Sequence, residues 1–279
     1  KDKFYNDRDR PDIEFYSPYP IDDLKNICDI LHKKGFKYVT GSQAQHEETY
    51  SIFSNFENVA DISYMPLNIF KKVKNIKIDD LLIIHPNIII IDILRQINDP
   101  LTSYWRIEKA FNRMILLFKH YSIDVNSNLK KIKINKNTED VLNYIRKVII
   151  SESKLLVFGY YAYQYFIYKS TNQKMDLYVP YYDVISNNFE DDVKRIFKKL
   201  TDKFKNISKK EFYKFFQFSS RKISILFEGK IVLNIYNNND ICIPYKFIEK
   251  KKINIVSYNY TIMRFLIVLF LLKFLQDFP

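Results

Sequence analysis

Two acidic residues near the start of the chain, Asp12 and Glu14, stand two positions apart within the aromatic run RPDIEFYSPYP. Because the side chains of a β-strand alternate between its two faces, a strand here would project both carboxylates from the same face. Two adjacent carboxylates repel each other unless water or a cation balances their charge. The spacing therefore leaves two interpretations, a solvated strand end or a pair that holds a cation.

A third acid, Asp61, lies between Ala60 and Ile62 in the run NVADISYMP, where an ionised carboxylate is costly unless something compensates it. Three carboxylates that converge from neighbouring strands can hold two Mg²⁺ or Mn²⁺ ions, which leave positions open for phosphate groups and support in-line phosphoryl transfer. We therefore predict that Asp12, Glu14 and Asp61 are metal ligands and catalytic residues. Surface acids on an edge strand are the alternative, because a D-x-E pair alone is a weak signal.

The hydrophobic pattern predicts the elements that must position these acids. After a strand at residues 12–17, the pattern predicts a helix that ends at Gly35, with an apolar stripe formed by Leu24, Ile27, Ile30 and Leu31. Further strands are predicted at residues 36–41, 49–53 and 58–66, and helices at residues 85–98 and 99–121. In the second half, a strand, a turn at Gly159, a helix and another strand follow one another. This order predicts a mixed α+β fold rather than an all-helical one.

A polar segment at residues 122–140 predicts a linker, so we place a domain boundary near residue 125, between a domain at 1–125 and a second at 126–279. The first 100 residues contain 13 Lys and Arg against 16 Asp and Glu, whereas the rest of the chain contains 31 against 16. An acidic first part and a basic remainder suit a metal site beside a track for a polyanion. Codon bias and solvated surfaces explain the same excess equally well.

Five runs occur in order along residues 10–185: PDIEFYSPYPIDDL, GFKYVTGSQAQHEETYSIF, NVADISYMPLNIF, HPNIIIIDILRQINDPLTSYWRIEKAFNRMILL and LLVFGYYAYQYF. Together they resemble the catalytic poly(A) polymerase subunits of large cytoplasmic DNA viruses, the poxvirus, asfarvirus and giant-virus group. The resemblance implies a polymerase-β-like nucleotidyltransferase that uses Mg²⁺ or Mn²⁺ to add AMP from ATP to RNA 3′ ends without a template. Asp12 and Glu14 match the paired acids of the family, and Asp61 matches its third acid.

The sequence departs from this resemblance at the turn that cradles the triphosphate. In this fold a Gly-Ser turn precedes the paired acids, whereas none of the eleven residues before Asp12 is Gly. Gly41 and Ser42 come after the pair, and we interpret them as a turn outside the phosphate site. We therefore expect that an N-terminal segment of the full protein is missing from the chain.

The run LLVFGYYAYQYF also resembles the start of a second nucleotidyltransferase copy, with Asp176 seventeen residues past Gly159. The second acid of a D-x-D or D-x-E pair would stand two residues after Asp176, but the chain has Tyr178 there. The second domain is therefore predicted to be a degenerate, non-catalytic copy that acts as a scaffold and contributes to RNA binding.

Basic residues supply candidate phosphate ligands. Arg106, Lys109 and Arg113 recur at helical spacing and are predicted to bind the triphosphate or RNA, with Tyr50 in a loop that borders the nucleotide. A second group is predicted to form a positive face for the RNA behind its 3′ end: Lys194, Arg195, Lys198, Lys199, Lys203, Arg221 and Lys222. Solvated helix faces are the alternative for both groups.

The predicted function is template-independent polyadenylation of mRNA. The alternatives are an inactive RNA-binding or processivity protein of the same fold, and a nucleotidyltransferase with another base specificity. The expected partners are ATP, an RNA 3′ end, and either a second copy of the chain or a separate processivity subunit. Cys28 and Cys242 show no redox or metal-binding spacing, and the apolar run Phe265–Leu272 is too short for a membrane span. We therefore expect an intracellular protein, and the resemblance implies the host cytoplasm or a virion.

Overall fold

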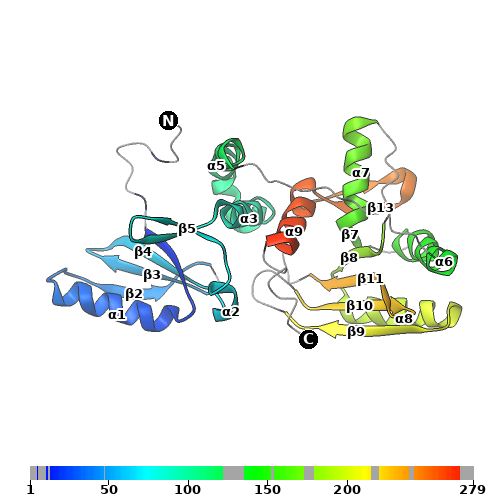
Figure 1. Ribbon diagram of the computed structural model, residues 1–279, viewed down its shortest axis with the longest axis horizontal. Coiled ribbons are helices and arrows are strands. Elements are labelled where there is room, and N and C mark those ends of the chain that lie inside the picture. The colour runs from blue at the N-terminus through cyan, green and yellow to red at the C-terminus, as the bar shows by residue number, and fades with distance from the viewer. Residues whose placement is uncertain are drawn as a thin grey trace. The chain divides into compact units, whose positions relative to one another are not determined.

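The computed structural model describes residues 5, 11, 13–46, 48–121, 135–151, 154–172, 179–214, 220–238 and 242–270. Figure 1 shows a mixture of helices and strands throughout, which confirms the predicted α+β class. The chain divides into two compact units, whose main segments are Lys1–His85 and Pro86–Lys273. Among the described residues, no helix has the length and apolar character needed to cross a membrane.

The first unit is built on a four-stranded sheet with the order β1-β4-β3-β2. Its elements are β1 (Ile13–Ser17), α1 (Pro20–Lys33), β2 (Thr40–Gln43), β3 (Thr49–Ser54) and β4 (Glu57–Tyr64). Strand β1 runs parallel to β4, and the other neighbouring strands are antiparallel. Helix α2 (Leu67–Phe70) and the hairpin of β5 (Asn75–Ile78) and β6 (Leu81–Ile84) follow.

Helix α1 covers one face of this sheet (Figure 1). The apolar cluster between helix and sheet includes Phe15, Leu24, Ile27, Leu31, Ile52, Ala60 and Ile62. The predicted apolar stripe of the helix is therefore confirmed except at Ile30, which is exposed. Since side chains alternate along β4, Asp61 projects from the opposite face of the sheet.

Gly41 and Ser42 lie within β2, so the predicted turn at these residues is wrong. Gly41 pairs with Ile52, and a Cβ atom added to it would lie 2.9 Å from the side chain of Leu24. The glycine therefore allows β2 to pass close to α1.

The second unit begins with helices. These are α3 (Pro86–Ile97), α4 (Pro100–Ser103), the 3₁₀ turn η1 (Tyr104–Arg106) and α5 (Ile107–His120). The single helix predicted at residues 99–121 is therefore interrupted by a 3₁₀ turn. Helix α3 packs against α5 and against the last described helix, α9 (Tyr258–Phe270), which explains why the contacts divide the chain between His85 and Pro86. The boundary predicted near residue 125 falls outside the described residues and stays a prediction.

A seven-stranded sheet with the order β12-β13-β7-β8-β11-β10-β9 forms the body of the second unit. Its strands are β7 (Leu156–Phe158), β8 (Tyr182–Ser186), β9 (Ile207–Phe212), β10 (Lys222–Phe227), β11 (Lys230–Asn237), β12 (Tyr245–Ile248) and β13 (Ile253–Val256). The helices of this part are α6 (Lys136–Tyr144), its π-helical continuation η2 (Ile145–Ile150), α7 (Gly159–Thr171), α8 (Phe189–Lys203) and the 3₁₀ turn η4 (Glu249–Lys251).

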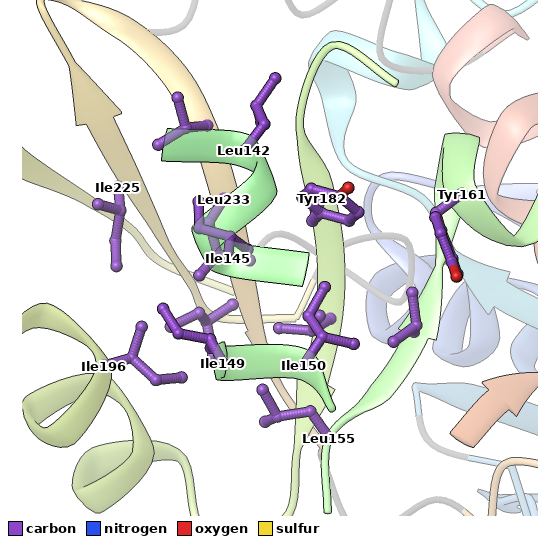
Figure 2. Close-up of a cluster of buried hydrophobic side chains, with 14 of the residues drawn as sticks. Leu142, Ile145, Ile149, Ile150, Leu155, Tyr161, Tyr182, Ile196, Ile225 and Leu233 are labelled. Carbon is purple, nitrogen blue, oxygen red and sulfur yellow. The ribbon is translucent and has the colours of Figure 1, made fainter. Parts of the chain in front are cut away.

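The largest core of the second unit lies between this sheet and the helices α6, η2, α7 and α8 (Figure 2). Ile145, Ile149 and Ile150 of η2 are fully buried. They lie between Ile196 of α8 and the strands that carry Tyr182, Ile225 and Leu233. Burial of this apolar surface fixes β8, β10 and β11 relative to one another.

Candidate active site

The first sheet brings two of the three predicted acids together. In the parallel pair of β1 and β4, Glu14 lies directly opposite Asp61. Residues that are direct partners on neighbouring strands project from the same face of a sheet, so both carboxylates lie on the face opposite α1. Asp12, the third predicted acid, lies outside the described residues.

Asp61 is held by two side chains that the sequence analysis did not identify. The hydroxyl of Ser51, its partner on β3, donates a hydrogen bond of 2.6 Å to Asp61 Oδ1, and Asn58 Nδ2 donates one of 3.1 Å to the same oxygen. Ser51 is buried and Asp61 is half-buried. The two donors therefore fix the orientation of the carboxylate.

The start of α1 also depends on a serine at the end of β1. The hydroxyl of Ser17 donates to the carboxylate of Asp23 and accepts from the backbone N–H of Tyr19 at 2.9 Å. The carbonyl oxygen of Ser17 accepts from the backbone N–H of Met65 at 2.9 Å. The bond between Met65 and Ser17 joins the ends of β1 and β4. The strands that carry Glu14 and Asp61 are therefore held together by a hydrogen bond outside their ladder as well as by the ladder itself.

The donor set fits a divalent cation. Neither Glu14 nor Asp61 forms an ion pair with another described residue, and the side-chain oxygen Oδ1 of Asn58 is buried without a hydrogen-bond partner in the described part of the chain. Carboxylate and amide oxygens are the ligands that Mg²⁺ prefers. Within the described residues, which do not include Asp12, no group of three or more His, Cys, Asp or Glu residues could hold a metal ion.

The structure does not support the predicted position of Tyr50 beside the nucleotide. Tyr50 lies in β3 rather than in a loop and pairs with Ile62, so it projects from the face that α1 covers. Glu14 and Asp61 project from the other face. Alternation along the strand is the physical reason, because Ser51, one residue further on, takes the position beside Asp61.

The predicted triphosphate ligands belong to the second unit. Arg106 is the last residue of η1, and Lys109 and Arg113 lie on α5. Arg106 and Lys109 are exposed, whereas Arg113 is half-buried. Their role stays a prediction.

The predicted RNA-binding residues differ in their surroundings. Arg195 pairs with Asp192 at 2.5 Å, Arg221 pairs with Glu190 and Glu211, and Lys203 Nζ lies 4.2 Å from the centre of the Tyr144 ring. Lys199 and Lys222 are half-buried. Lys194 and Lys198 are exposed and stand one helical turn apart on α8, so these two lysines are the strongest candidates of the group.

Comparison with known proteins places the chain in a family. The family model "Poly(A) polymerase catalytic subunit" matches residues 1–103, and the model "APMV, Putative poly(A) polymerase, catalytic subunit, C-terminal" matches residues 116–277. The chain belongs to the viral poly(A) polymerase catalytic subunit family. The resemblance found in the sequence is thereby confirmed.

Relatives within this family come from giant viruses and asfarviruses and carry the name "Putative poly(A) polymerase catalytic subunit". The mimivirus relative from Acanthamoeba polyphaga mimivirus is 34% identical over 98% of this chain and 52% of its own length. An African swine fever virus relative is 41% identical over 30% of this chain and 18% of its own length. The chain therefore spans about half the length of the mimivirus relative, and less of the other.

The fold matches the crystal structure of the Megavirus polyadenylate synthase. The TM-score is 0.86 at 32% sequence identity, and the match covers 98% of this chain and 57% of the synthase. The α+β architecture of both units is therefore that of a family member along almost the whole chain.

Proposed function

We propose that the chain forms the catalytic part of a viral poly(A) polymerase, which transfers AMP from ATP to the 3′ ends of mRNA. The placement of Glu14 directly opposite Asp61, on the face of the sheet that α1 does not cover, carries this proposal. Membership of the poly(A) polymerase family supports it. No specific observation favours either alternative, the inactive RNA-binding protein or the nucleotidyltransferase with another base specificity.

In the proposed mechanism Asp12, Glu14 and Asp61 hold Mg²⁺ or Mn²⁺. The bound metal supplies positive charge for the triphosphate and lowers the pKa of the attacking 3′ hydroxyl group. The protein contributes a fixed orientation of the acids, because Ser51 and Asn58 both donate to Oδ1 of Asp61. The parallel pairing of β1 and β4 keeps Glu14 beside it.

The decisive experiment is an extension assay on a labelled oligo(A) primer, with each nucleoside triphosphate offered separately and with Mg²⁺ or Mn²⁺ supplied. Asp61→Asn is expected to lower the rate by on the order of 100-fold or more, because it removes a ligand charge from the metal site. RNA affinity is expected to stay the same or rise slightly, since a negative charge near phosphates is lost. Asp29→Asn, an exposed acid on α1, is the matched control and should extend at the wild-type rate.

Three outcomes separate the proposal from its alternatives. Extension with ATP that depends on Asp61 supports it. Preference for another triphosphate points to a different base specificity, and RNA binding without extension in the wild type points to an inactive binding protein. Light scattering of the same preparation, with and without RNA, tests the predicted second copy of the chain.

A further inference from the structure

The second unit contains a repeat of the sheet that carries the proposed active site. Strands β1, β4, β3 and β2 of the first unit correspond in order to β8, β11, β10 and β9. In each set the first two strands are parallel and the other neighbours are antiparallel. In each set one helix, α1 or α8, connects the first strand to the next one in the chain.

The two sheets agree in their irregular features as well as in their strand order. The ladder of β3 and β4 has a bulge between Ile52 and Phe53, and the ladder of β10 and β11 has one between Ile225 and Leu226. Both hairpin turns contain two residues with positive φ: Asn55 and Phe56 in the first, Glu228 and Gly229 in the second. A bulge and a left-handed turn at corresponding positions align the two sheets residue by residue.

Hydrogen bonds outside the ladders repeat in the same way. The hydroxyl of Ser186 donates to the carboxylate of Asp192 and accepts from the backbone N–H of Asn188. The hydroxyl of Ser17 makes the same two bonds, with Asp23 and Tyr19. The backbone bond from Met65 N to Ser17 O, 2.9 Å long, returns as the bond from Asn238 N to Ser186 O, 3.0 Å long. Ser186 therefore corresponds to Ser17, which fixes the alignment of β8 with β1.

This alignment identifies the counterpart of the proposed active site. Asp183, three residues before Ser186, corresponds to Glu14, and its partner on β11, Asn234, corresponds to Asp61. The predicted acid Asp176 and the neighbouring Tyr178 lie outside the described residues, and Asp183 instead takes the equivalent position in the sheet. Tyr181 stands two residues before Asp183, as Asp12 stands two before Glu14 in the sequence.

The counterpart site keeps the supporting serine but replaces an acid by an amide. The hydroxyl of Ser224 donates to Asn234 Oδ1 at 2.6 Å, as Ser51 donates to Asp61. Asn234 Nδ2 in turn donates to Asp183 Oδ1 at 2.9 Å. Only one carboxylate of this group therefore remains in the described part of the second sheet.

Basic and bulky side chains surround this carboxylate where the first sheet has small ones. The directly paired Thr49 and Ser63 of the first sheet correspond to the directly paired Lys222 and Tyr236 of the second. Lys222 Nζ and Arg264 Cζ lie 5.6 Å and 5.2 Å from the centre of the Tyr236 ring. Arg264 comes from α9, so a helix adds a second cation to the site.

The two cations near Asp183 oppose the effect of burial on its carboxyl group. Burial raises the pKa of Asp183 to about 6, and Asn234, Arg264, Lys222 and Tyr236 oppose that rise. Burial lowers the pKa of Lys222, Asp183 raises it, and Arg264 lowers it further. At neutral pH the site therefore contains a buried carboxylate that requires positive charge from its neighbours.

We propose that Lys222 and Arg264 supply in the second unit the positive charge that a divalent metal supplies in the proposed active site, so that this site is a metal-free structural centre. The side chains that balance Asp183 also join α9 to the sheet. The comparison with a metal rests on the proposed function, whereas the coupling of the two cations to Asp183 does not.

A double-mutant cycle tests the coupling in the full chain. At pH 7.5, Arg264→Met is expected to lower the Tm by on the order of 10 °C, because it leaves a buried carboxylate short of charge. Asp183→Asn in the same background should restore part of that loss. At pH 5, below the folded pKa of Asp183, the carboxyl group is neutral and the coupling should shrink. Strictly additive effects at pH 7.5 would overturn the proposal. Lys222→Met provides the same cycle should Arg264→Met fail to fold.

Binding of Mn²⁺, followed by electron paramagnetic resonance, tests the absence of metal. The Asp61→Asn chain is expected to retain no site-bound Mn²⁺. Residual binding that disappears when Asp183→Asn is added would overturn the proposal. A wild-type chain that binds no Mn²⁺ would count against the proposed function instead, while the double-mutant cycle would still decide the coupling.

Discussion

At the scale of single residues, the hydroxyl of Ser51 is the contact that most directly shapes the proposed site. It reaches Asp61 Oδ1 from the neighbouring strand at 2.6 Å, and Asn58 reaches the same oxygen. A carboxylate held at one oxygen presents the other in a fixed direction. Ser51 therefore acts as a positioning residue, through Asp61, in the proposed mechanism.

Replacement of Ser51 by Ala is expected to lower kcat for primer extension roughly 10- to 100-fold, as is typical when a residue supporting a metal ligand is lost. The KM for RNA should not change, and the Mg²⁺ concentration needed for half-maximal rate should rise. The matched variant is Ser224→Ala, which removes the corresponding hydroxyl of the second sheet. It should cost about 1 kcal/mol of stability and leave kcat unchanged. Equal effects of the two variants on kcat would contradict the positioning role.

The residue types of Glu14 and Asp61 suggest candidates, because acids in strands are costly unless their charge is compensated, and the resemblance to the family then matches them to its acids. Ser51 and Asn58 were not predictable in the same way. Which residue lies beside Asp61 depends on the register of β3 against β4, and the bulge after Ile52 shifts that register. The sequence shows that Tyr50 and Ser51 face opposite sides, but not which side the acids share.

At the scale of elements, the start of α7 shows how closely two segments approach. Gly159, the first residue of this helix, has a φ of +66°. A Cβ atom on it would lie 2.3 Å from Asp183 Oδ2 and 3.1 Å from Asp183 Cγ. The helix therefore begins directly against the carboxylate of β8, and only glycine satisfies both the backbone conformation and the close contact.

Gly159→Ala is expected to destabilise the chain by roughly 2–4 kcal/mol, because backbone strain and a steric clash add. Gly229→Ala is the matched control, since Gly229 has a φ of +76° and a Cβ atom added to it would meet no described atom within 4 Å. It should cost only about 1 kcal/mol, the backbone part alone. Unfolding in urea, followed by circular dichroism, measures both. Equal losses in the two variants would show that Asp183 accommodates the added methyl group.

The periodicity of apolar residues, together with glycines at the ends of segments, predicted most elements of the chain. The helix α1 and the turn into α7 follow from local sequence, since an apolar stripe and a left-handed glycine are local signals. The break between α4 and α5 does not follow from local sequence, and neither does the place of Gly41 within β2. Gly41 fits its strand because of Leu24 on a separate helix, and such a contact has no local signature.

At the scale of the whole molecule, the excess of basic residues divides into paired and exposed groups. Arg195 and Arg221 are engaged by acids, and Lys222 lies beside Asp183, whereas Lys194 and Lys198 are exposed on α8. If α8 follows the RNA backbone, these two lysines are its contacts.

The variant Lys194→Gln with Lys198→Gln is expected to weaken oligo(A) binding and to make it less dependent on salt. Each phosphate contact of a single strand contributes about 0.7 to the slope of log K against log salt concentration, so the slope should fall by about 1.4. Lys33→Gln with Lys34→Gln changes the net charge equally. These residues are the last residue and the C-cap of α1, the helix that covers the sheet face opposite the acids. An unchanged slope in the α8 variant would place the RNA elsewhere.

The repeat itself was only partly predictable from the sequence. The second copy was expected after Gly159, but its acid was expected at Asp176 rather than Asp183. The corresponding residues differ in type, as with Asp61 and Asn234 or Thr49 and Lys222, so sequence similarity alone could not align them. Strand register and the positions of bulge and turn were needed to do so.

The shared register of the two sheets has a consequence for how the chain folds. Each strand of one sheet finds in the other a partner of the same direction, with the bulge at the same place, so backbone geometry alone does not reject a wrong match between the copies. The side chains must therefore determine which strands pair. A mispaired sheet that set β8 against β4 would separate Asp183 from Asn234 on β11 and from Lys222 on β10, and would leave a buried carboxylate without the groups that compensate it. We therefore expect the groups around Asp183 to favour the native pairing of β8 with β11 over pairing with β4.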